Sequence, residues 1–137
     1  MSDHGWCSLR LRFEEREIQL LRGAEQLRGT AMAHGARSDT LRTALNLAKA
    51  GQKVGRGVPG SLVTLDESEL ELLIEALRFA AREVPLAARR DEGQGAARGE
   101  AVMAAFPELV EKGSWRSFGL ARELEALAAK LEAALKT

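Results

Sequence analysis

The sequence predicts an all-α protein, a compact bundle of four or five helices with a minor two-stranded β ribbon. Apolar residues recur at helical spacing in several separate stretches of the chain. Aromatic residues make up only 4% of a chain that is 45% hydrophobic, so the core must consist mainly of Leu, Ala, Val and Ile. A third observation is a segment that occurs nearly twice, each time after a short stretch of alternating polarity.

The repeated segment covers residues 13–24 and 65–76, at an offset of 52 positions. Five residues recur unchanged: Glu15 as Glu67, Glu17 as Glu69, Leu20 as Leu72, Leu21 as Leu73, and Ala24 as Ala76. The alternating stretches at 9–13 and 62–65 predict the two strands of the ribbon. Two interpretations stay open, an internal duplication or convergence, because Glu, Leu and Ala are common in any amphipathic helix. The regions that follow the two copies do not match, which favours convergence.

The first predicted helix spans residues 14–28, and the second spans residues 38–51. Acidic residues in the first turn of the first helix suit the helix dipole, and Gly23 should weaken that helix by about 1 kcal/mol relative to alanine. Ser38 or Asp39 is a good N-cap for the second helix. The glycine-rich stretch 51–60 predicts a loop.

The third predicted helix, residues 67–84, has the most regular apolar pattern. Thr64 or Asp66 precedes it, each with a Glu three residues later, which is the spacing of a capping box. Its apolar surface extends most of the way round the helix. Such a helix is either central to a core or covered by a second subunit. Pro85 is expected to end it.

Residues 86–99 predict a flexible internal linker, since they combine charged residues with three glycines. A short helix interrupted at Pro107 should follow. The last predicted helix spans residues 117–135, and its leucines at 120, 124, 127 and 131 form a seam. That seam is a core-facing stripe or a short coiled coil, and fewer than three heptads favour the first.

The chain of 137 residues predicts a single helical domain with a loose N-terminus at residues 1–8. Its formal net charge is zero, so bulk charge does not indicate a nucleic-acid or membrane partner. The first residues lack the pattern of a signal peptide, and no apolar run approaches the length of a membrane span. The default expectation is a cytoplasmic protein with no membrane partner.

Residues able to carry catalysis are scarce. The chain has one cysteine, Cys7, two histidines, His4 and His34, and no tyrosine. The carboxylates Glu67, Glu71 and Glu75 line one side of the third helix, but no E-x-x-H pair accompanies them as in carboxylate-bridged metal bundles. The glycine-rich stretch lacks the G-K-[ST] of a phosphate loop. We therefore expect no enzyme activity, no metal and no cofactor.

Charge is segregated along the chain. Residues 37–60 carry five basic side chains and one acidic one, whereas residues 61–84 carry six acidic and two basic. The basic set, with the glycine-rich stretch, predicts an alternative function as a nucleic-acid-binding regulator acting through residues 37–57. The candidate residues of this basic stripe are Arg37, Arg42, Lys49, Lys53 and Arg56. Pairing with the adjacent acidic helix is the competing interpretation.

The leading hypothesis is a small non-enzymatic interaction or regulatory protein that binds another protein or a second copy of itself. A homodimer would cover the surplus apolar surface of the third helix, and an aromatic cluster before the last helix would anchor a partner. The candidate partner-binding residues are Leu72, Ile74, Phe79, Trp115, Arg116 and Phe118. A ligand pocket between apolar helices is a third hypothesis, although no residue indicates a ligand.

Overall fold

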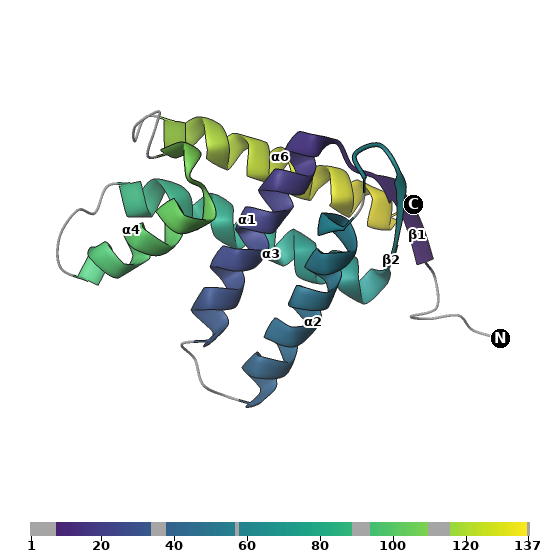
Figure 1. The fold of residues 1–137 in the computed structure, drawn as a ribbon, viewed down its shortest axis with the longest axis horizontal. Coiled ribbons are helices and arrows are strands. Elements are labelled where there is room, and N and C mark those ends of the chain that lie inside the picture. The colour runs from purple at the N-terminus through teal and green to yellow at the C-terminus, as the bar shows by residue number, and fades with distance from the viewer. Residues whose placement is uncertain (1–7, 34–37, 57, 89–93, 110–115, 137) are drawn as a thin grey trace.

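A computed structural model describes residues 8–33, 38–56, 58–88, 94–109 and 116–136. These residues form five helices and one two-stranded antiparallel sheet, so the predicted mostly helical fold with a minor ribbon is confirmed (Figure 1). The elements are β1 (Ser8–Arg12), α1 (Glu15–Ala33), α2 (Ser38–Gly55), β2 (Leu62–Asp66), α3 (Glu67–Ala88), α4 (Gln94–Ala105) and α6 (Arg116–Lys136).

Helix α3 is the centre of the fold. Figure 1 shows α6 running alongside it and α1 crossing it, and α2, α4 and β2 also contact it. Leu70, Leu73, Leu77 and Val84 on α3 are fully buried. These neighbours explain why α3 is apolar most of the way round, since a helix inside a bundle needs an apolar surface toward each neighbour.

The ribbon pairs β1 with β2, with Val63 and Leu65 buried and Arg10 and Thr64 on the exposed face. Leu11 lies opposite Val63, which is the residue 52 positions after it. On either side, Arg10 lies opposite Thr64 and Arg12 lies opposite Leu62. At the same offset Arg10 corresponds to Leu62 and Arg12 to Thr64, so the equivalents of one pair form the other pair. This register is the one that a local two-fold axis between the two copies requires.

Both copies also begin their helices alike. The backbone N–H of Asp66 donates to the Glu69 carboxylate at 2.9 Å, and the N–H of Glu69 donates to Asp66 at 2.8 Å. This is the predicted capping box, with Asp66 rather than Thr64 as the cap. At the equivalent positions of α1, the N–H of Glu14 donates to Glu17 at 2.9 Å. Glu17 and Glu69 therefore accept equivalent hydrogen bonds from the backbone at the starts of the two helices.

The helices that follow the copies correspond as well, although not at the same offset. Lys53 of α2 pairs with Glu69 at 2.6 Å, and Lys130 of α6 pairs with Glu17 at 2.7 Å. Matching the two lysines sets α2 against α6 at an offset of 77 positions, which places buried residues on buried residues. The buried pairs are Leu47 with Leu124, Ala50 with Leu127, and Val54 with Leu131. The fold is thus two β-α-α halves, with α4 and its flanking residues inserted in the second.

Four boundaries differ by more than one residue from those that the sequence predicted. Helix α1 continues past residue 28 to Ala33. Helix α2 continues to Gly55, because Gly51 leaves room for α1: a β-carbon there would lie 2.8 Å from Cγ of Glu25. Helix α3 continues past Pro85 to Ala88, since a proline so near the end removes a single backbone hydrogen bond. Helix α4 begins at Gln94, so residues 86–88 and 94–99 of the predicted linker are helical.

The Asp66 cap gives a first prediction. The hydroxyl of Ser68, followed by the N–H of Glu69, lowers the pKa of Asp66 below its usual value. Asp66→Ala should lower the unfolding free energy by about 1 kcal/mol at neutral pH, and Asp66→Asn should cost less because the amide oxygen still caps. A depressed pKa adds stability above the unfolded value of about 4, which is lost as pH falls further. Urea titrations should therefore show the gap between wild type and Asp66→Ala closing toward pH 3, and a constant gap would contradict this account.

Candidate functional site

A groove of about 630 Å³ lies along the first half of α3, where α2 passes beside it. We call it the α3 groove. Its lining combines short polar side chains, carboxylates, one lysine and one leucine. The lining residues are Asn46 and Lys49 from α2, Asp66 at the end of β2, and Ser68, Glu69, Glu71, Leu72 and Glu75 from α3.

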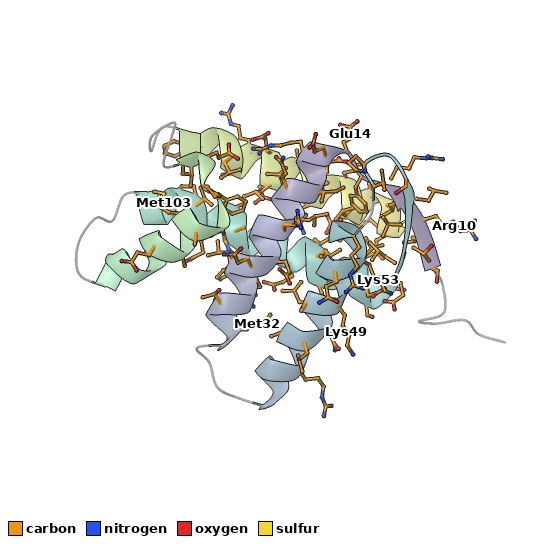
Figure 2. The ribbon with its side chains drawn as sticks, in the orientation of Figure 1. Arg10, Glu14, Met32, Lys49, Lys53 and Met103 are labelled. Atoms are coloured by element: carbon orange, nitrogen blue, oxygen red, sulfur yellow. The ribbon has the colours of Figure 1, made fainter. Side chains whose placement is uncertain are left out.

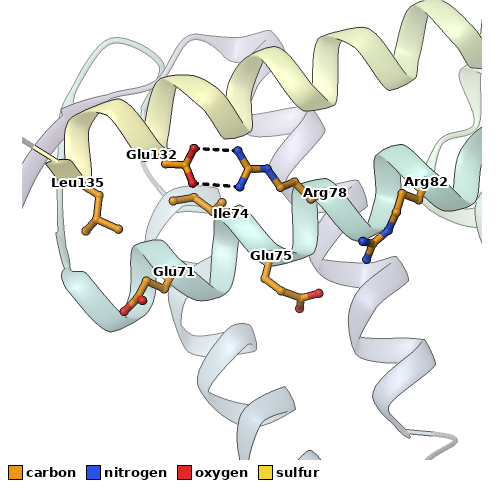
Figure 3. Close-up of a pocket in the computed structure, with 7 residues that line it drawn as sticks. All are labelled: Glu71, Ile74, Glu75, Arg78, Arg82, Glu132 and Leu135. Carbon is orange, nitrogen blue, oxygen red and sulfur yellow. Dashed lines mark hydrogen bonds and ion pairs between the residues drawn. The ribbon is translucent and has the colours of Figure 1, made fainter.

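A smaller hollow of about 320 Å³ continues along α3 toward α6 (Figure 3). Glu71 and Glu75 line both spaces. Figure 3 shows these two carboxylates on one side of α3, and Arg78 reaching toward α6 on another. Arg78 donates two hydrogen bonds to Glu132, at 3.0 and 2.9 Å, which ties α3 to α6.

The carboxylates of the α3 groove differ in how they are neutralised. Glu69 pairs with Lys53, and Glu75 pairs with Arg28 of α1 at 2.8 Å. Asp66 is held by its capping hydrogen bonds. Glu71 is exposed and makes no hydrogen bond or ion pair with any residue that the structure describes. Among the described residues, Glu71 is therefore the one carboxylate of the α3 groove without an intramolecular partner.

The predicted basic stripe lies beside this acidic helix. Figure 2 shows Lys49 and Lys53 on the part of α2 that runs next to the start of α3. Lys53 is already paired with Glu69, and Lys49 lines the α3 groove among carboxylates. Arg42 and Arg56 are exposed. Arg37 lies outside the described residues.

The three predicted partner-binding residues on α3 are covered to different extents within the chain. Ile74 is only 6% exposed, and Leu72 and Phe79 are partly buried against the core. The guanidinium of Arg28 lies 4.5 Å from the centre of the Phe79 ring. Ile74 is therefore covered and Phe79 is partly covered within the chain, whereas part of Leu72 lines the α3 groove. The sequence could not show this, because it does not specify how many helices surround α3.

The aromatic cluster before the last helix is only partly described. Phe118 is 54% exposed at the start of α6. Arg116 begins that helix, with its side chain outside the described part, and Trp115 lies outside the described residues altogether. Phe118, the member whose side chain is described, is not among the residues that line the α3 groove.

The described residues contain no group of three or more His, Cys, Asp or Glu side chains that could hold a metal ion. Within the same ranges, no helix is both long enough and apolar enough to cross a membrane. Cys7, His4 and His34 lie outside the described residues.

Comparison with known proteins gives no match to a family model, a curated protein or a solved structure. The α3 groove is therefore the basis on which function can be proposed. Sequence patterns indicated its acidic side, through Glu71 and Glu75, and placed Asn46 with Lys49 on one stripe of the second helix, but missed Ser68. Ser68 carries no signal of its own, because it matters only once α2 lies beside α3.

Proposed function

We propose that this protein is a small non-enzymatic interaction protein that docks a segment of a partner protein in the α3 groove. The observation that supports the proposal is an open groove that presents one leucine and a carboxylate without a partner among the described residues. Leu72 supplies the apolar contact, and Glu71 supplies directional charge. Such a combination suits a peptide segment, because an apolar contact gives affinity and a polar contact fixes orientation.

The same geometry makes the nucleic-acid alternative less favourable. A stripe that tracks phosphates needs free cations spaced along one face. Lys53 is engaged by Glu69, and Lys49 faces a lining with four carboxylates. A phosphate backbone at Lys49 would meet repulsion from these carboxylates. Binding of a protein segment therefore explains more features of this surface than binding of a nucleic acid does.

Site-specific photo-crosslinking in cells tests the proposed function. We would place a benzophenone amino acid at Asn46, which is exposed and lines the α3 groove, and in a control protein at Ala104, which is exposed on α4. The Asn46 probe should give discrete adducts to one or a few proteins, resistant to nuclease, that the Ala104 probe does not give. Mass spectrometry identifies the partner and the crosslinked segment.

Two results would count against the proposal. The first is the same adduct pattern from both positions, which would mean that the groove is no more used than the rest of the surface. The second is recovery of nucleic acid alone, lost after the double change Lys49→Glu and Lys53→Glu. That result would support the basic stripe instead.

A further inference from the structure

The α3 groove has a counterpart in the other half of the molecule, and the counterpart is filled. At the offset of 52 positions, Ser68, Leu72 and Glu75 correspond to Arg16, Leu20 and Gly23 of α1. At the offset of 77 positions, Asn46 of α2 corresponds to Glu123 of α6. The surface between α1 and α6 is therefore equivalent to the surface between α3 and α2.

The chain's own residues 106–109 occupy that counterpart. Phe106 lies against Gly23, where a β-carbon would come within 2.7 Å of Cζ of the ring. Arg16 donates to Glu108 at 2.8 Å and to Glu123 at 2.8 Å, which clamps the segment between the two helices. Phe106 and Leu109 are only 4% and 2% exposed. Phe106 lies in this site against Gly23, Glu108 is bound by Arg16, and Leu109, three positions after Phe106, is buried in the same core cluster.

Among the described residues, no segment fills the α3 groove as residues 106–109 fill its counterpart. In the first half, only residues 34–37 separate α1 from α2, whereas α3 and α6 are separated by the insertion that supplies residues 106–109. The difference is visible in the equivalent leucines: Leu20 is 3% exposed, whereas Leu72 is only partly buried and lines open space. The same kind of surface is closed in one half and open in the other.

Charge is changed at the equivalent positions. Arg16, which binds the carboxylate of the chain's own segment, corresponds to the neutral Ser68. Gln19 corresponds to Glu71, the carboxylate without a partner among the described residues. In the α3 groove, a segment with an acidic residue at the position of Glu108 would find Ser68 in place of the Arg16 cation and would approach the carboxylate of Glu71. The α3 groove thus favours a basic residue at that place.

The space available is also changed. Gly23, which makes room for an aromatic ring, corresponds to Glu75, whose side chain is held by Arg28. An aromatic ring cannot lie against α3 there as Phe106 lies against α1. The first apolar residue of the occupant should therefore be a smaller aliphatic one.

We propose that the α3 groove takes a short partner segment of the form aliphatic, any residue, Lys or Arg, aliphatic, lying as residues 106–109 lie in the other half. This inference rests on the proposed function and specifies the partner. A second copy of this chain is disfavoured as the occupant, because its own segment carries Phe106 and Glu108.

Two labelled peptides that differ at one residue test the inference. They are acetyl-Ala-Ala-Leu-Pro-Lys-Leu-Ala-amide and the same peptide with Glu in place of Lys, each with a fluorophore on an added C-terminal cysteine. By fluorescence anisotropy at low salt, the full-length protein should bind the Lys peptide about tenfold more tightly than the Glu peptide, a preference that shrinks as salt rises.

Three variants connect that preference to the groove. Glu71→Gln should remove most of it, and Glu71→Lys should reverse it in favour of the Glu peptide. The matched control is Glu100→Lys, which makes the same change at an exposed position of α4 outside the groove and should leave the preference intact. Circular dichroism checks that all three variants fold as wild type does.

Equal binding of both peptides, no binding of either at millimolar concentration, or a preference that survives Glu71→Lys would overturn the inference. These results are distinguishable from failure of the proposed function. Crosslinks from Asn46 to a protein segment of another kind would leave docking in the groove standing and refute only the basic-aliphatic segment. Absence of specific crosslinks would remove both.

Discussion

Leu73→Ala is expected to lower the unfolding free energy by about 3 kcal/mol, a larger loss than removal of the Asp66 cap should cause. Leu73 is completely buried on α3, the helix that contacts every other described helix of the fold. Removing three methylene-sized groups there leaves a cavity that the closely packed elements around α3 can close only in part. Chemical denaturation followed by circular dichroism measures the loss.

Leu45→Ala is the matched control, because it makes the same chemical change at a leucine that is 65% exposed on α2. Alanine is a good helix former and little apolar contact is lost, so the unfolding free energy should change by less than about 0.5 kcal/mol. Comparable losses for the two variants would mean that α3 is not the centre of the core.

Gly23→Ala and Gly29→Ala should have opposite effects, although both glycines lie inside α1. Alanine at Gly23 would overlap the ring of Phe106, with a β-carbon 2.7 Å from Cζ, and the buried ring must move. We expect a net loss of about 1 to 2 kcal/mol, since overpacking outweighs the gain in helix propensity. Alanine at Gly29 meets nothing within 4 Å and should stabilise the protein by up to about 1 kcal/mol.

A double-mutant cycle shows whether the Gly23 effect depends on Phe106. In a Phe106→Leu background, whose smaller side chain lacks the ring, Gly23→Ala should lose most of its cost, so the two changes should be strongly coupled. If Gly23→Ala stabilises the protein as Gly29→Ala does, Phe106 does not pack against α1 at Gly23, and the counterpart of the α3 groove is not filled by residues 106–109.

Much of the fold follows from local sequence patterns. Helical spacing of apolar residues predicted α1, α2, α3 and α6, and alternating polarity predicted the ribbon at 9–13 and 62–65. The pairing of Asp66 with Glu69 followed from their spacing, because a capping box involves residues three positions apart. The helix ends at Gly55 and Ala88 did not follow from the local sequence, because tertiary packing decides whether a helix continues past a nearby glycine or proline.

The candidate site was predicted only in part. The acidic side of α3 and the basic side of α2 are visible in the sequence, but whether they repel a partner, bind one or pair with each other depends on their separation. The structure brings Lys53 to Glu69 and leaves Glu71 without a described partner. The surplus of apolar residues on α3, which indicated a dimer from the sequence, reflects the number of helices around it.

The sequence by itself determined the helices, the Asp66 cap and the two extended segments of the ribbon, because each is set by neighbours within a few positions. The similarity of residues 13–24 to residues 65–76 is also visible in the sequence alone. Only the tertiary structure decided that the halves correspond beyond that segment. The match of α2 to α6 is displaced by the insertion between α3 and α6, so no single offset reveals it. Packing between residues about a hundred positions apart, Arg16 with Glu108 and Glu123, closes one of two equivalent surfaces and leaves the other open.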